Sequence, residues 1–220
     1  MPSLPITLTP FSAPWMTWVL IALFVIVTVS VLLNGSQVTT GFVTYFQRVE
    51  RRYTDGIVGP GVGLMMHVFR LASVALALYW GLWSLYAPHT PFRPLPFVIL
   101  ILLTAVVWGV HRLLLWWIMA TFSQRNRMQA LTNHYLNLWT SLAVVLFVWV
   151  LIGSSLSKPT PILYLMGLTV ATYPLAVLIK ALSVVPLSWR TLLYVPLYVL
   201  TVDILPFAAL FFVGKTIVTL

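Results

Sequence analysis

Long apolar stretches separated by short polar connections run along the whole chain. Six stretches have about 18 or more mostly apolar residues, the length a helix needs to cross a bilayer. They cover residues 14–33, 62–86, 95–122, 133–156, 160–182 and 190–218. Each is apolar all round, without the alternation typical of barrel strands. The pattern predicts an all-α fold: one polytopic membrane bundle over residues 1–220, with about six transmembrane helices.

The composition supports a membrane location. Hydrophobic residues make up 61% of the chain and charged residues only 7%, whereas soluble domains contain about 25% charged residues. The absence of cysteine excludes disulfides, thiolate chemistry and iron–sulfur clusters with cysteine ligands.

The distribution of lysine and arginine predicts the orientation of the bundle. One set of connections and helix ends carries Arg48, Arg51, Arg52, Arg125, Arg127, Lys180 and Arg190. The opposite set carries Arg93, Lys158 and Lys215. The positive-inside rule therefore places both termini on the periplasmic side. The first residues lack the basic segment of a signal peptide, so we expect the first helix to be retained.

Residues 40–53 have the pattern of an amphipathic interfacial helix. Phe42, Tyr45, Phe46, Val49 and Tyr53 fall on one face, and Arg48, Arg51 and Arg52 fall on the others. Such a helix lies on a membrane that contains anionic lipids. Docking of a partner protein is the alternative interpretation. The basic residues are scattered over short connections, so we expect no nucleic-acid binding.

Residues near the ends of the stretches have structural explanations. Thr132 or Asn133 is a plausible N-cap for the fourth helix. Aromatic residues that gather near the outer ends are expected to anchor the helices at the membrane interface. They are Trp15, Trp18, Tyr79, Trp80, Trp83 and Tyr86.

Five ionisable residues lie within the predicted spans: His67, Arg70, His111, Arg112 and Asp203. Such residues are energetically costly in a membrane and mark candidate functional sites. Arg70, Arg112 and Asp203 lie about 12, 15 and 20 Å from the cytoplasmic ends, at about 1.5 Å per residue. We therefore predict that Asp203 faces the bundle interior and pairs with Arg112 or Arg70. The pair has either a structural role or a role in a proton or anion site.

Prolines are expected to bend or open the last two helices. Pro174 lies in the fifth span, and Pro196 and Pro206 lie in the sixth. Each removes a backbone donor from its helix. Carbonyl groups freed near Asp203 would then line a polar pocket, as in the broken helices of transporters.

Enzyme classes that act in membranes need residues that the sequence does not provide. There is no HExxH motif for zinc proteolysis. Asp203 is the only acid within a span, whereas carboxylate-pair chemistry needs two. The histidines are staggered rather than matched in depth, which disfavours haem. We therefore expect no catalytic residue, no metal and no cofactor.

Two segments resemble a known family. LYVLTVDILPFAALFFVGK at 197–215, with LMMHVFRL at 64–71, resembles an uncharacterised multi-pass inner-membrane family of Bacteroidetes. The family's acidic-Ile-Leu-Pro element and following lysine would match Asp203, Ile204, Leu205, Pro206 and Lys215. The family's acid is usually glutamate, so Asp203 keeps the charge with a shorter side chain. The resemblance implies a Gram-negative inner membrane and no established activity.

These observations give two functional hypotheses. The leading one is a non-enzymatic subunit or assembly factor of a cell-envelope complex, with a membrane-protein partner or a second copy of the chain. The alternative is a small carrier or channel with a proton or anion site around Asp203, Arg112 and Arg70.

Overall fold

The computed structural model describes six helices. It covers residues 13–46, 60–122, 125–156, 159–184, 201 and 204–219. The helices are α1 (Pro14–Phe46), α2 (Pro60–Tyr86), α3 (Pro94–Phe122), α4 (Arg125–Ser155), α5 (Thr160–Val184) and α7 (Leu205–Thr219). Every described element is a helix, so the all-helical part of the prediction is confirmed.

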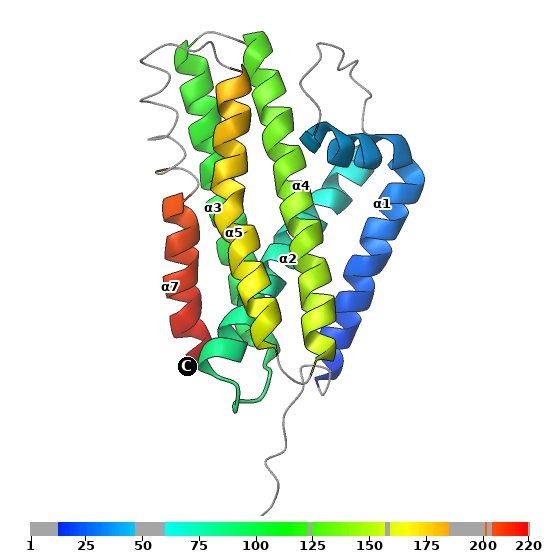
Figure 1. The fold of residues 1–220 in the computed structure, drawn as a ribbon, viewed down its shortest axis with the longest axis vertical. Coiled ribbons are helices and arrows are strands. Elements are labelled where there is room, and N and C mark those ends of the chain that lie inside the picture. The colour runs from blue at the N-terminus through cyan, green and yellow to red at the C-terminus, as the bar shows by residue number, and fades with distance from the viewer. Residues whose placement is uncertain are drawn as a thin grey trace, which may run out of the picture.

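Five of the described helices are long and apolar enough to cross a membrane: α1 to α5. They suggest a membrane protein. The sixth predicted span covers residues 190–218, and the structure describes within it Thr201, Ile204 and most of the 15 residues of α7. The start of α1 and the end of α7 lie at the same end of the bundle (Figure 1).

Several helices begin with a proline. Pro14, Pro60 and Pro94 are the first residues of α1, α2 and α3. A proline fits this position because its fixed φ suits a helix and its missing N–H would have no helical partner there. Pro206 lies in the first turn of α7, shortly after Ile204, whose backbone is π-helical.

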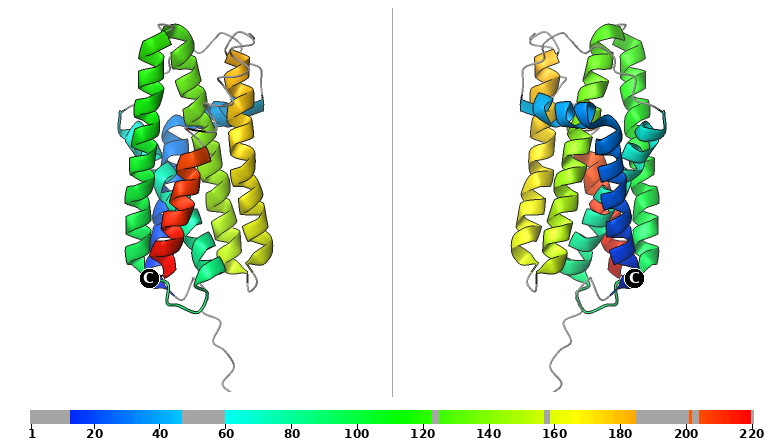
Figure 2. Two further views of the ribbon diagram at one scale, coloured as in Figure 1. Left: turned by 90° about the vertical axis from the view of Figure 1, so that its left-hand side faces the viewer. Right: turned by 90° about the vertical axis from the view of Figure 1, so that its right-hand side faces the viewer.

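α1 continues well beyond its predicted end at residue 33. It runs to Phe46, and its last part turns sharply and crosses the bundle (Figures 1 and 2). This part includes the beginning of the interfacial helix expected over residues 40–53. The remainder of that helix, with Arg48, Arg51 and Arg52, lies outside the described residues.

α4 begins at Arg125, eight residues before the predicted start of the fourth helix. The expected cap at Thr132 or Asn133 is therefore wrong, because both residues lie inside the helix. The polar run at its start contains Arg, Met, Gln, Ala and Leu, which have high helix propensity. Low hydropathy is therefore a poor guide to this helix boundary.

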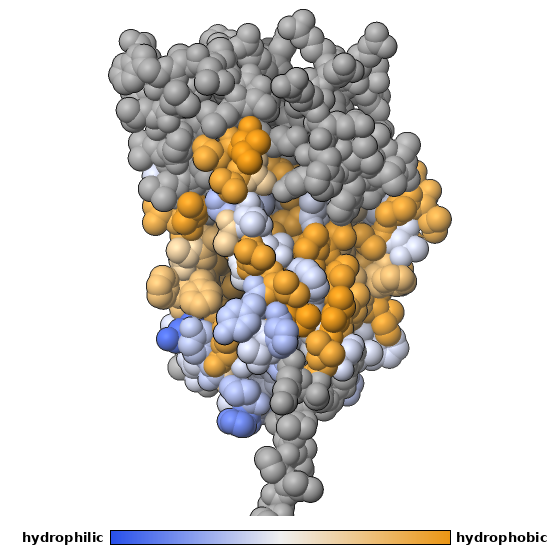
Figure 3. All heavy atoms as spheres, in the orientation of Figure 1, coloured by the Kyte–Doolittle hydropathy of each residue, from blue (hydrophilic) through white to orange (hydrophobic). Residues whose placement is uncertain are grey.

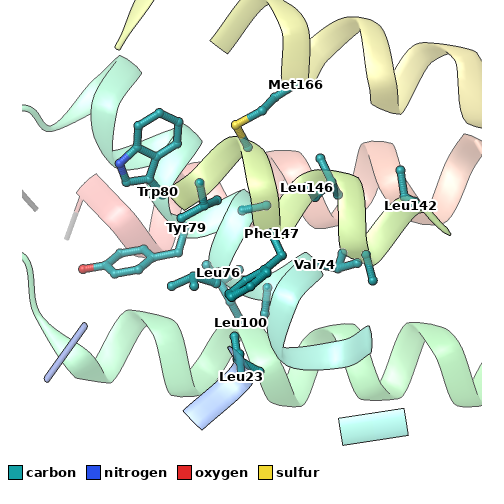
Figure 4. Packing of buried hydrophobic residues seen from close by; sticks show 14 of the residues in the cluster. Leu23, Val74, Leu76, Tyr79, Trp80, Leu100, Leu142, Leu146, Phe147 and Met166 are labelled. Atoms are coloured by element: carbon teal, nitrogen blue, oxygen red, sulfur yellow. The ribbon is translucent and has the colours of Figure 1, made fainter. Parts of the chain in front are cut away.

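α2 is the central helix. In its most apolar stretch 61% of the residues are buried, compared with 22% in each of α1, α3 and α5. It packs against α1, α3, α4 and α7. Its fully buried side chains include Phe69, Leu76 and Trp80, and Figure 4 shows Leu76 and Trp80 among core residues from the neighbouring helices.

Two glycines allow close helix packing around α2. A Cβ atom on Gly153 of α4 would lie 2.8 Å from Trp80 Cζ2 and 3.0 Å from Ile162 Cγ2. A Cβ atom on Gly214 of α7 would lie 2.8 Å from Leu82 Cδ1. Real Cβ atoms do not approach so closely, so a larger residue at either position requires a neighbour to move. At Gly153 this neighbour is the bulky Trp80 ring, whereas at Gly214 it is the flexible end of a leucine side chain.

The outer surface of the bundle is strongly apolar. Figure 3 shows hydrophobic residues over much of the described surface on this face and hydrophilic residues near its lower end. Large exposed apolar side chains occur on all the described helices, including Leu32, Leu102 and Phe212. Such a surface is compatible with lipid contact.

The aromatic residues near the outer end only partly fit the expected anchor role. Trp18 is 70% exposed, as expected for an anchor. Trp80, Tyr79 and Trp83 are only 0%, 1% and 5% exposed, so for them the prediction of interface anchors is wrong. They belong to the core because they lie on the central helix, which has protein on most sides.

Candidate functional site

Polar side chains of α2, α3 and α4 meet inside the bundle and form the best-defined candidate site. His67 and Arg70 lie three residues apart on α2, so they share one face of the helix. Arg70 Nε donates to Thr140 Oγ1 of α4 at 2.8 Å. The Thr140 hydroxyl in turn donates to the Leu136 carbonyl at 2.8 Å. This chain of bonds links the guanidinium on α2 to the backbone of α4.

The contact between Arg70 and His67 defines the state of the imidazole. Arg70 Nη1 lies 3.3 Å from His67 Nδ1. A guanidinium has only donors, so Nδ1 must accept, and the proton of the neutral ring is then on Nε2. His67 consequently presents an N–H donor on its other side.

Trp108 of α3 connects these residues to Arg112. The rings of His67 and Trp108 have centroids 4.9 Å apart. The guanidinium carbon of Arg112 lies 5.3 Å from the centroid of the Trp108 ring. A cation in this position is attracted by the ring by about 0.5–2 kcal/mol. We call His67, Arg70, Trp108, Arg112 and Thr140 the basic cluster.

The two arginines lie at a similar depth along their helices. Arg70 is ten residues after Pro60, and Arg112 is ten residues before Phe122. Each is therefore about 15 Å from its helix end, at about 1.5 Å per residue. The basic cluster thus concentrates positive charge within the apolar part of the bundle.

No acidic side chain is present among the described residues. The chain has three acidic residues, Glu50, Asp55 and Asp203, and all of them lie outside the described ranges. The predicted pairing of Asp203 with Arg112 or Arg70 therefore stays a prediction.

The described start of α7 contacts α4 one residue before Thr140. Phe207 stacks on Trp139 of α4, with ring centroids 5.5 Å apart. Trp139 directly precedes Thr140, and Phe207 follows Asp203 by four residues. α7 therefore approaches α4 at the level where Arg70 is bound.

His111 contacts a different helix and a different aromatic residue from His67. It is 5% exposed, and its ring centroid lies 5.3 Å from that of Tyr135 on α4. His111 and His67 therefore contact different aromatic residues. Groups of three or more histidine, cysteine, aspartate or glutamate side chains that could hold a metal ion are absent from the described part of the chain.

The three prolines that were predicted to break helices differ in where they lie in the structure. α5 continues through Pro174 from Thr160 to Val184. Pro206 lies in the first turn of α7. Pro196 lies outside the described residues.

The sequence did not identify Thr140 or Trp108 as members of the site. Trp108 precedes Arg112 by four residues on α3, and this spacing is typical of a contact along one helix face. No comparable signal pointed to Thr140, because its partner lies on another helix.

A second group of polar contacts holds the connection between α2 and α3, at the end of α2 away from the basic cluster. Tyr79 Oη donates to the Arg93 carbonyl at 2.7 Å and accepts from the Arg93 amide at 3.0 Å. Trp15 Nε1 donates to the Phe92 carbonyl, and Trp83 Nε1 donates to the Thr90 carbonyl, each at 3.0 Å. These bonds satisfy backbone groups of the connection, which indicates a structural role.

Comparison with known proteins adds no assignment for this site. No family model, curated protein or solved structure matches the chain. The resemblance to the Bacteroidetes family therefore remains a prediction from the sequence.

Proposed function

We propose that the protein is a multi-pass inner-membrane protein that acts as a subunit or assembly factor of a cell-envelope complex. The five apolar helices support the membrane location. The choice of the inner membrane rests on the family resemblance. The proposal includes no catalytic activity, and this part rests on the sequence motifs alone.

The observation that carries the proposal is the contrast between the glycines of the bundle. Gly153 and Gly214 are enclosed by side chains of the same chain. Gly167 of α5 is exposed, and a Cβ atom there would have nothing within 4 Å. A glycine in the interior of a helix costs about 1 kcal/mol relative to alanine in water. Packing within the described chain gives no reason for glycine at this position. Gly63 and Gly109 have equally open surroundings, but of these three glycines only Gly167 is exposed.

Gly167 belongs to an exposed apolar face of α5. We define this face by Tyr164, Gly167, Leu168, Ala171 and Leu175, all of which are exposed. Their spacing places them on one side of the helix. Small residues four positions apart let two membrane helices approach closely. The face therefore suits a helix of a membrane-protein partner or of a second copy of the chain.

The test compares two glycine variants with open surroundings. A Cβ atom added at Gly109 of α3, like one added at Gly167, would have nothing within 4 Å. Gly109→Leu is therefore a matched control for Gly167→Leu. Tagged proteins would be purified in a mild detergent and analysed by quantitative mass spectrometry and by mass in the micelle.

We expect Gly167→Leu to remove a stoichiometric partner, or to convert a dimer to a monomer, while Gly109→Leu retains it. A wild-type protein that is monomeric and partner-free would contradict the proposal. Equal effects of the two variants would contradict the assignment to α5.

The basic cluster favours a second candidate function, a small carrier or channel with a proton or anion site around Asp203, Arg112 and Arg70. Charged residues within membrane helices often mark ion pathways. Proton flux into proteoliposomes, followed with an enclosed pH-sensitive dye, tests the proton-carrying form of this candidate. Flux that Asp203→Asn abolishes would support it, and absence of wild-type flux would count against it.

A further inference from the structure

The basic cluster presents hydrogen-bond donors to its surroundings. Arg70 uses Nε to bind Thr140 and Nη1 to bind His67. The remaining N–H groups of its guanidinium have no carboxylate partner among the described residues. His67 adds the Nε2–H donor inferred above, and Arg112 adds a second guanidinium beside Trp108. Two guanidinium groups and an imidazole N–H, with no carboxylate among the described residues, are donors of the kind that bind an oxyanion.

The charge of the cluster exceeds what the chain can neutralise within its predicted spans. Arg70 and Arg112 carry two positive charges, and Asp203 is the only acidic residue in any predicted span. Pairing with Asp203 would leave one positive charge uncompensated. An uncompensated charge in an apolar medium is unfavourable, so a bound anion would stabilise this arrangement.

The residues around the cluster bear on whether the anion is a lipid headgroup or a soluble ion. Arg112 does not point toward the nearer end of α3, because its guanidinium lies over Trp108, one turn back toward the start of the helix. Val68 of α2 follows His67 and Leu113 of α3 follows Arg112, and both are exposed apolar residues. Acyl chains could contact such residues while a phosphate contacts the guanidinium groups.

We propose that the basic cluster binds a phosphate group, with Arg70, Arg112 and His67 as its donors. The phosphate belongs either to the headgroup of an anionic phospholipid or to soluble phosphate. The exposed apolar residues that follow His67 and Arg112 in the sequence favour the lipid. This inference rests on the proposed membrane location of the helices, but it is independent of the partner face on α5.

Native mass spectrometry of the full-length protein in detergent micelles tests the site. The probes are phosphatidylglycerol, which has a net negative charge, and phosphatidylcholine, which carries a similar phosphate with a compensating cation. Inorganic phosphate is tested separately by its effect on thermal unfolding. The variants are Arg70→Gln and Arg112→Gln, with Arg93→Gln as control. Arg93 lies in the connection at the opposite end of the bundle.

We expect the wild-type protein and Arg93→Gln to retain phosphatidylglycerol in preference to phosphatidylcholine. Arg70→Gln and Arg112→Gln should bind it about tenfold more weakly, as expected from the loss of a charge-assisted contact. If instead inorganic phosphate stabilises the wild type and not these variants, without a lipid preference, the source is soluble phosphate.

Phosphatidylglycerol retention and phosphate stabilisation that are both independent of Arg70 and Arg112 would overturn the proposal. Arg70 also links α2 to α4, so Arg70→Gln could fail to fold. In that case the result for Arg112→Gln alone tests the proposal. If neither variant folds, the wild type decides: no preference for phosphatidylglycerol and no stabilisation by phosphate would overturn the proposal. Gly167→Leu should keep the lipid preference, so failure of the partner proposal remains distinguishable from failure of this one.

Discussion

The contact between Gly153 and Trp80 provides a sharp test of the packing between α2 and α4. Gly153→Ala adds one methyl group, which would lie 2.8 Å from Trp80 Cζ2, closer still to Cη2, and 3.0 Å from Ile162 Cγ2. The Trp80 ring is 0% exposed, so it has little room to move. Relief of the clash therefore requires the two helices to separate.

The expected net effect is a loss of stability. Overpacking of a well-packed core costs about 1–3 kcal/mol. The higher helix propensity of alanine offsets up to about 1 kcal/mol of this cost. With the full offset, we therefore expect Gly153→Ala to lower the free energy of unfolding by up to about 2 kcal/mol. Gly167→Ala should be neutral or slightly stabilising, because the space around Gly167 is open.

Reversible unfolding in mixed detergent micelles, followed by tryptophan fluorescence, measures these differences. Trp80→Phe supplies a double-mutant test, because the smaller ring leaves room for the new methyl group. Trp80 Nε1 has no hydrogen-bond partner within the described ranges, so this change removes no such bond there. The Gly153→Ala effect should be smaller in the Trp80→Phe background. Equal stability of Gly153→Ala and Gly167→Ala would refute the close packing.

Two further predictions concern hydrogen bonds. Thr140→Val removes the acceptor of Arg70 Nε and should lower the free energy of unfolding by about 1–2 kcal/mol, since the donor is charged. Thr104→Val should have a smaller effect, because the Thr104 hydroxyl bonds only to a carbonyl of its own helix. If both variants lost the same free energy of unfolding in micelles, the role of Thr140 would be contradicted. Tyr79→Phe removes both bonds to the Arg93 backbone and should speed proteolytic cleavage between α2 and α3, whereas unchanged cleavage would show that these bonds do not hold the connection.

The existence of the helices could be predicted because the signal is local. A run of apolar residues long enough to cross a bilayer is visible without knowledge of any partner. The predicted starts at residues 62 and 95 lie within two residues of Pro60 and Pro94, where α2 and α3 begin. The start of α4 could not be predicted from hydropathy, because its first turns are polar and polar residues are equally typical of a connection.

The arrangement of the helices could not be predicted in the same way. Faces toward lipid and faces toward protein are both apolar in a membrane helix, so periodicity does not distinguish them. This explains why the sequence does not reveal the burial of Tyr79 and Trp80. Arg70 and Arg112 were recognised because charges are rare in spans. Thr140 is an ordinary residue in a membrane helix, and only the structure shows that it binds Arg70.

Cysteine labelling tests most directly the central claim that the helices cross a membrane. The chain contains no cysteine, so His89→Cys and Asn126→Cys each introduce a single reactive thiol. Position 89 lies between α2 and α3, and position 126 lies at the opposite end of α3, near the start of α4. In spheroplasts, a membrane-impermeant maleimide should label the His89→Cys variant directly and the Asn126→Cys variant only after permeabilisation. Labelling of both variants without permeabilisation would contradict the account.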